Sequence, residues 1–157
     1  MPTRYSYRAD PAVPQFDDSQ PLIVFDGMCV LCSRGVEWMM RHDRQGTSHL
    51  AAIQEPLPRS LYAHYKLDAD RFDTFMVLAG GWPYVRWQGM CAAARTMPQP
   101  WRGFGYLGRA VPAGLGDLFY DWVQRNRVRW FGARDKCFVP DEVQRTRFLS
   151  LQERPPN

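Results

Sequence analysis

The chain has 157 residues, enough for one domain with a substantial core, and 45% hydrophobic and 23% charged residues exclude a disordered protein. Its net charge of +4 permits an acidic partner but does not require one. No apolar run approaches the roughly 20 residues that span a bilayer, and residues 1–20 lack the apolar core of a secretory signal. We therefore expect a cytoplasmic protein with no membrane partner.

The first half of the chain alternates between strand and helix patterns. Residues 1–20 are expected to form a flexible tail. Two strands are expected, at 21–27 and 48–54, and each is followed by a helix, at 29–44 and 58–67. A strand–helix–strand unit of this kind favours a parallel pair of strands with a right-handed crossover.

The second half begins with a hairpin and continues as helix. Residues 73–89 are expected to form two strands joined at Gly80–Gly81, followed by a short helix over 90–97. An apolar stripe with helical spacing then predicts a helix that buries this face against the sheet, and a last helix is expected over about 141–151. The residues of the stripe are Leu115, Leu118, Phe119, Trp122 and Val123. The pattern predicts an α/β fold with a mixed four-stranded sheet and flanking helices.

Cys29 and Cys32 stand where the first strand ends and the first helix begins, in the stretch "FDGMCVLC". The unpaired N–H groups at a helix N-terminus stabilise a thiolate, so Cys29 at the cap should be the more acidic thiol. Cys32, one turn later on the apolar face, should be more buried and should keep its proton longer. This asymmetry suits a dithiol that attacks with Cys29 and resolves with Cys32.

Two other uses of these cysteines are open. They could be packed as small apolar side chains, or they could be two ligands of a structural zinc ion. Zinc usually needs a second pair of ligands, whereas Cys91 and Cys137 are single and His42, His49 and His64 show no ligand spacing. The redox interpretation is therefore favoured, with no metal and no cofactor.

The stretch "FDGMCVLC" resembles the Asp-x-x-Cys-x-x-Cys sequence of the DCC-type thiol-disulfide oxidoreductases. "DTFMVL", "YDWVQRNRVRWFG" and "ARDKC" resemble later blocks of that family in the same order, over about residues 21–150. The resemblance implies a thioredoxin-like core over 21–100 and a helical extension over 101–157 packed on it. It also implies a thiol-disulfide oxidoreductase whose substrate is a protein or small-molecule thiol or disulfide.

Four further residues are expected to support the dithiol. Asp26 could accept protons from the dithiol, although an Asp-Gly turn residue that accepts a nearby N–H is the favoured interpretation. Cys137 could be a third thiol at the site or an idle one. An arginine of the basic segment 125–136, either Arg125 or Arg129, is expected to lie near the dithiol and to lower the pKa of Cys29. The same segment could bind nucleic acid, but the modest charge of the whole chain disfavours this.

Overall fold

The computed structural model describes residues 3–72, 74–133, 135–136, 138–142 and 144–149. Its strands are β1 (Leu22–Phe25), β2 (His49–Ala52), β3 (Met76–Ala79) and β4 (Trp82–Val85). Its α-helices are α1 (Val30–His42), α2 (Pro56–His64), α3 (Arg86–Arg95), α4 (Trp101–Gly108) and α5 (Ala113–Phe131). Two short 3-10 helices, Ser6–Ala9 and Gln144–Arg147, lie near the ends of the described chain.

The four strands form one mixed sheet in the order β2-β1-β3-β4. β1 and β2 are parallel, as the strand–helix–strand pattern predicts, while β3 pairs antiparallel with both β1 and β4. Gly80 and Gly81 form the hairpin turn, with φ angles of 56° and 81° that favour glycine. The predicted α/β architecture with a thioredoxin-like arrangement of sheet and helices is therefore confirmed.

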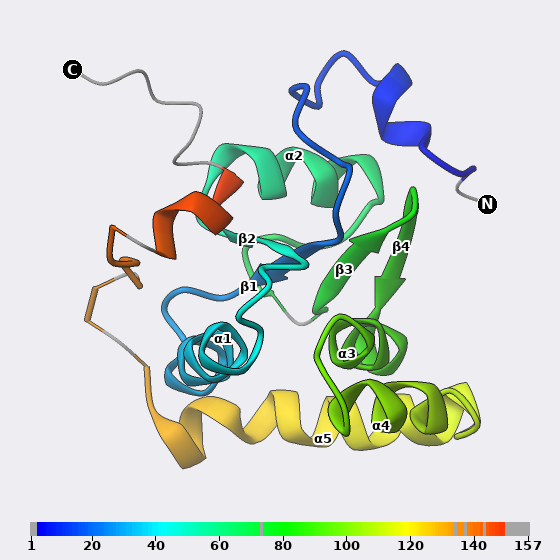
Figure 1. Ribbon diagram of the computed structural model, residues 1–157, viewed down its shortest axis with the longest axis vertical. Helices are drawn as coiled ribbons and strands as arrows, with labels where there is room; N and C mark the ends of the chain where they lie inside the picture. The colour runs from blue at the N-terminus through cyan, green and yellow to red at the C-terminus, as the bar shows by residue number, and fades with distance from the viewer. Residues whose placement is uncertain (1–2, 73, 134, 137, 143, 150–157) are drawn as a thin grey trace.

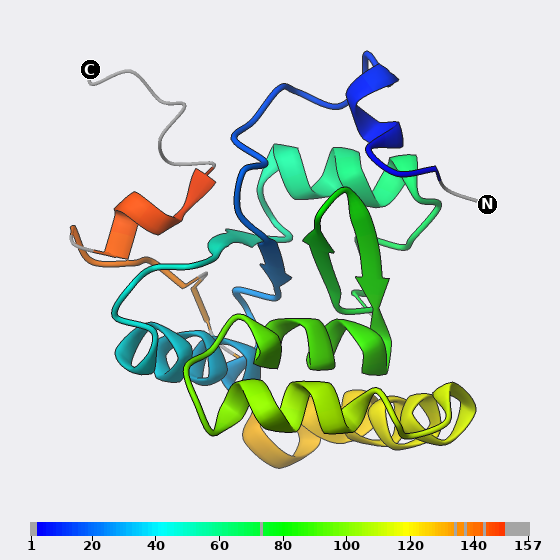
Figure 2. The ribbon, with the colours of Figure 1, turned by 45° about the vertical axis from the view of Figure 1, so that its right-hand side comes forward.

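The sheet separates two apolar layers. Because successive side chains of a strand point to opposite faces, Leu22 and Val24 belong to one layer and Ile23 and Phe25 to the other. The first layer is covered by α2, and the second contains side chains of α1 and α3. Figure 1 shows α5 running across the far side of α1 and α3, and Figure 2 shows α4 beside it. None of the described helices is both long and apolar enough to cross a bilayer.

Part of the expected flexible tail packs against the layer that α2 covers. Tyr7 and Val13 are buried there. His64 of α2 is hydrogen-bonded through Nε2 to Ser6 Oγ at 2.9 Å and through Nδ1 to the Asp10 carboxylate at 2.7 Å. Two side chains of this segment, Tyr7 and Val13, therefore belong to the core, which its proline-containing and polar composition did not indicate.

The apolar stripe of α5 faces solvent, which corrects the expectation that it is buried on the sheet. Leu115, Leu118, Phe119 and Trp122 are each more than half exposed. The buried face carries Gly116, Tyr120 and Arg127 instead. Long-range polar contacts and close packing decide this orientation.

α5 is held against α3 and the loop before β3 by polar side chains. Tyr120 Oη accepts the N–H of Phe75 at 2.7 Å, and Asp117 and Asp121 both pair with Arg86. Gly116 lies against the Trp87 ring so closely that a Cβ would sit 2.3 Å from ring atoms. Turning the stripe inward would break all of these contacts.

We expect Leu118→Ala to change the free energy of unfolding by no more than about 0.5 kcal/mol, because the side chain is 65% exposed. The matched substitution Leu61→Ala in α2 removes a fully buried side chain and should cost about 2–5 kcal/mol. Urea unfolding of both variants measures the difference. Equal losses would mean that the stripe of α5 is buried after all.

The C-terminal segment returns to the sheet without forming the expected helix in its described part. Gln144–Arg147 is a 3-10 turn, and Arg147 donates hydrogen bonds to the Asp43 carboxylate and to Ser48. Phe138 and Phe148 pack edge-on against Phe25. The segment thus packs on the second apolar layer, and the Phe138 N–H donates to the Gly27 carbonyl, in the turn before Cys29, at 2.9 Å.

Candidate active site

The two cysteines lie at the N-terminus of α1, as the sequence predicts. Cys29 is the N-cap, in extended conformation, and its Sγ accepts the N–H of Cys32 at 3.4 Å. The preceding turn is closed by Asp26, whose carbonyl accepts the Cys29 N–H and whose Oδ1 accepts the Met28 N–H at 2.9 Å. The favoured interpretation of Asp26 as a turn residue therefore agrees with its contacts.

The surroundings make the two thiols unequal. A hydrogen bond from the Cys32 thiol, the Cys32 N–H and the positive charge of Arg127 together lower the pKa of Cys29 to about 6, against the opposing effect of burial. Cys32 donates this hydrogen bond, which raises the pKa of Cys32 far above its ordinary value. Burial of Cys32 raises that pKa further. These opposite directions favour Cys29 over Cys32 as the site of the negative charge when the pair loses its first proton.

Arg127 is the cation that the structure places against the dithiol. Its Nη1 lies 3.3 Å from Cys32 Sγ and 3.2 Å from Asp26 Oδ2, and only 7% of the residue is exposed. Its Nη2 donates to the carbonyl of Phe72 at 3.5 Å, and its guanidinium lies over the Phe72 ring. Arg127 thus joins α5, the turn before α1 and the segment before β3 at one point.

This corrects the expectation that Arg125 or Arg129 occupies the position. Residues two apart on a helix point to nearly opposite sides, so a helix that presents Arg127 to the dithiol turns both neighbours away. Arg125 is exposed and donates to the carbonyl of Asp121 in its own helix, and Arg129 is exposed. The helix is predicted correctly, but the arginine beside the dithiol is Arg127.

Asp26 has a second function besides closing the turn. Its Oδ2 balances the charge of Arg127, and its Oδ1 also accepts a hydrogen bond from Gln54 Nε2 at 2.8 Å. Gln54 Oε1 in turn accepts the Gly27 N–H at 3.1 Å. Gln54 follows β2, which is parallel to β1, so the ends of the two strands bring it to the dithiol. Nothing in the local sequence indicates this role for Gln54.

The end of α5 covers Cys29. Ala133 forms a bridge to Cys29, and the carbonyl of Gly132 accepts the Val30 N–H at 3.5 Å. Cys29 is consequently only 1% exposed, whereas Cys32 is partly exposed, which reverses the expected order of burial. The backbone of residues 132–133 therefore lies beside the first turn of α1 and Cys29.

Of the other described candidates, Cys91 and His64 are not brought to the dithiol. Cys137 lies outside the described residues. Cys91 is buried in α3, with its sulfur next to Gly108 of α4. His64 binds the N-terminal segment, and within the described part of the chain no group of three or more His, Cys, Asp or Glu side chains could hold a metal ion.

The arrangement can perform nucleophilic thiol chemistry near neutral pH. It supplies a thiolate at a helix N-terminus, a protonated second thiol beside it and a buried cation that cannot lose its proton. Sequence reasoning assigned no role to two contributors, Arg127 and Gln54. Of these, only Arg127 lies in a segment that the sequence singled out, the basic segment 125–136.

We expect the reduced protein to ionise one thiol with a midpoint near pH 6, because its neighbours lower the pKa of Cys29. Thiolate absorbance in the ultraviolet, followed against pH, measures this midpoint. The disulfide form, which has no thiol at positions 29 and 32, is the matched control. A midpoint near the value of a free thiol, about 8.5, would contradict the assigned environment.

The same pKa predicts how stability depends on pH. A lowered pKa stabilises the folded state fully above the unfolded value of about 8.5, and this contribution is lost as pH falls through about 6. The free energy of unfolding of the reduced form should therefore rise between pH 6 and 8.5 relative to that of the disulfide form. Denaturant titrations of both forms at several pH values test the difference.

Comparison with known proteins agrees with this geometry. Residues 23–133 match the family model described as DCC1-like thiol-disulfide oxidoreductase. The chain is 32% identical over 128 residues to the uncharacterized protein YuxK of Bacillus subtilis, which covers 82% of this chain and 93% of that protein. It is 24% identical over 121 residues to the DCC family protein At1g52590, chloroplastic, of Arabidopsis thaliana, covering 77% and 70% of the two chains. No solved structure matches the chain significantly.

Proposed function

Because the chain belongs to the DCC1-like thiol-disulfide oxidoreductase family, we propose that it exchanges disulfides through Cys29 and Cys32. The observation that carries this proposal is the unequal pair of thiols at the N-terminus of α1, with Arg127 beside it. In a dithiol of this kind one sulfur ionises readily and can attack, whereas the second sulfur keeps its proton. The proposal includes a protein or small-molecule thiol or disulfide as the substrate and a reducing, cytoplasmic location.

The reaction proceeds in two exchanges. The Cys29 thiolate attacks one sulfur of the substrate disulfide, a mixed disulfide forms, and the first substrate thiolate leaves and takes up a proton. Cys32 then loses its proton and attacks Cys29 Sγ, which releases the second substrate thiol and leaves a Cys29–Cys32 disulfide. Two electrons pass from the dithiol to the substrate, and the reverse sequence oxidises a substrate dithiol.

Arg127 and Asp26 act on the first exchange as positioning residues. Arg127 stabilises the negative charge of the dithiol, and Asp26 holds the guanidinium in place. The second exchange requires Cys32 to become a thiolate. Once Cys29 is in a mixed disulfide it no longer carries charge, so Arg127, at 3.3 Å, can then favour ionisation of Cys32.

Thiol counting and disulfide mapping test the proposal. Mild oxidation should remove two thiols per chain, and mass spectrometry should map the bond to Cys29 and Cys32. The Cys32→Ser variant, isolated from cells, should carry partners trapped as mixed disulfides on Cys29. A disulfide that maps to Cys91 or Cys137 would refute the assignment.

The zinc alternative is tested on the same preparation. A structural zinc site needs four ligands, and the described residues offer no group of three. Metal analysis of protein purified under reducing conditions distinguishes the two functions. About one tightly bound zinc per chain would favour the zinc site over disulfide exchange.

A further inference from the structure

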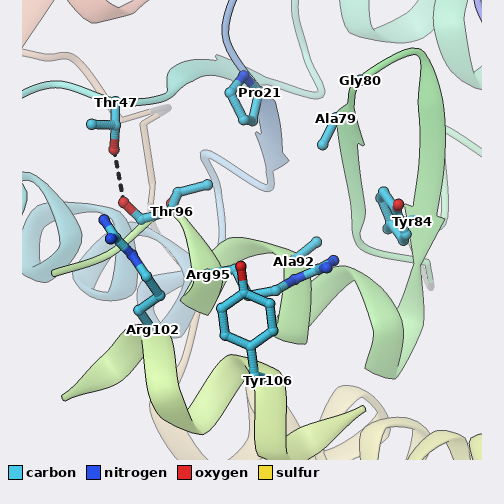
Figure 3. Close-up of a pocket in the computed structure, with 10 residues that line it drawn as sticks. All are labelled: Pro21, Thr47, Ala79, Gly80, Tyr84, Ala92, Arg95, Thr96, Arg102 and Tyr106. Carbon is cyan, nitrogen blue, oxygen red and sulfur yellow. Dashed lines mark hydrogen bonds between the residues drawn. The ribbon is translucent and has the colours of Figure 1, made fainter. Parts of the chain in front are cut away.

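A pocket lies at the end of the sheet opposite to the dithiol. It is a pocket of about 380 Å³ that opens where Pro21 precedes β1 and Gly80 follows β3. Cys29 follows the other end of β1, so the sheet separates the two sites. Figure 3 shows the pocket with Arg95 of α3 and with Arg102 and Tyr106 of α4 on one side, and Tyr84 of β4 on another.

The lining carries positive charge with no balancing carboxylate. Two arginines, Arg95 and Arg102, contribute to it, and none of the residues that line it is Asp or Glu. Neither arginine forms an ion pair with any described residue, in contrast to Arg86, Arg127 and Arg147. Arg102 uses its Nε to donate to the carbonyl of Met97 at 3.2 Å, which leaves the remaining guanidinium N–H groups for another acceptor.

Arg95 is held in one place without a hydrogen-bond acceptor at its Nε. Its guanidinium lies 5.2 Å from the ring centre of Tyr84 and 5.9 Å from that of Tyr106, between the two side chains (Figure 3). Its stem packs against Gly105, where a Cβ would approach the Arg95 Cγ to 2.8 Å. The Nε atom is buried and has no hydrogen-bond partner among the described residues. Most buried donors have an acceptor, so the hydrogen-bonding capacity of this guanidinium is not used up within the described structure.

We propose that this pocket binds a small oxyanion, either a phosphate group or a carboxylate group of a small molecule, through Arg95 and Arg102. A planar guanidinium binds both kinds of group through paired N–H donors. The aromatic rings and the packing at Gly105 fix Arg95 before the ligand arrives, which reduces the entropy lost on binding. The site is independent of the dithiol and stands whether or not the chain exchanges disulfides.

Titration calorimetry of the full chain tests the proposal, with inorganic phosphate and succinate as the two probes at constant ionic strength. We expect saturable binding of at least one probe, weakened about tenfold by Arg95→Gln and by Arg102→Gln. Arg109→Gln is the matched control, because Arg109 is an exposed arginine of the same region that does not line the pocket. It should leave the affinity within about twofold of the unsubstituted protein.

The results separate the possible outcomes. Binding of phosphate alone, of succinate alone or of both identifies the ligand chemistry and supports the site. If circular dichroism shows that Arg95→Gln unfolds the protein, the affinity of the Arg102→Gln variant decides alone, because Arg102 is exposed. The proposal is overturned if neither probe binds saturably, or if Arg109→Gln weakens binding as much as Arg102→Gln does.

Discussion

Replacement of Cys29 with serine is expected to lower the rate of disulfide exchange at pH 7 by at least about a thousandfold. A serine hydroxyl does not ionise near neutral pH and cannot form a disulfide, so the first exchange has no nucleophile. The rate is measured as turnover of a small disulfide in the presence of an excess of reductant. The matched control is Cys91→Ala, which removes a buried thiol outside the site and should leave the rate within about twofold.

Cys32→Ser separates the two exchanges. This variant keeps the Cys29 thiolate and a hydroxyl donor beside it, so the first exchange should proceed once per chain and then stop. One equivalent of substrate should be released in a burst, and the mixed disulfide should be found on Cys29 by mass spectrometry. Continued turnover in Cys29→Ser would instead assign the chemistry to another thiol.

The second large effect is expected for Arg127→Met, which removes the charge and keeps much of the apolar stem. The pKa of Cys29 should rise from about 6 towards the ordinary value of about 8.5. For a full rise to 8.5 the thiolate fraction at pH 7 falls about thirtyfold, but each thiolate becomes more than about tenfold more nucleophilic, so the rate should fall only about twofold. Alkylation rates measured against pH give both quantities.

Arg127→Met should also destabilise the fold. Arg127 and Asp26 form a largely buried pair, with 8% and 15% of their side chains exposed, and removing one partner leaves the other charge uncompensated. Such losses are about 3–5 kcal/mol, and the hydrogen bonds of Met28 and Gln54 to Asp26 favour the lower end. Urea unfolding of the reduced protein measures the loss.

The double variant Asp26→Asn with Arg127→Met separates stability from acidity. Removing both charges should recover part of the lost stability, while the pKa of Cys29 stays high because no cation remains. Arg125→Met and Arg129→Met are the matched controls on the exposed sides of α5, and both should leave the pKa unchanged. If Arg127→Met does not move the pKa either, the guanidinium has a structural function only.

Much of the core could be predicted from the sequence, because it depends on contacts between near neighbours. The continuous apolar run at Leu22–Phe25 predicts a strand that is buried on both faces, and the pair Gly80–Gly81 favours a tight hairpin turn. The spacing of Cys29 and Cys32 behind an Asp-Gly turn places both thiols in the first turn of a helix. These features follow from backbone geometry and local hydrogen bonds.

The surroundings of the dithiol depend on contacts between distant residues, and only the tertiary structure decides them. The helical spacing of the apolar residues in α5 predicts a helix, as observed. The face that α5 turns inward is set by Gly116, by Tyr120 and by the ion pairs of Arg86 with Asp117 and Asp121, and no local pattern reveals these contacts. That rotation selects Arg127 instead of Arg125 or Arg129, and it also brings Ala133 over Cys29. Helical periodicity fixes which residues share a face, whereas the face that is buried results from competition between apolar area and specific long-range contacts. The sequence by itself thus determined the thiols and the helix that carries them, and the packing of α5 determined the charge beside them and the access to them.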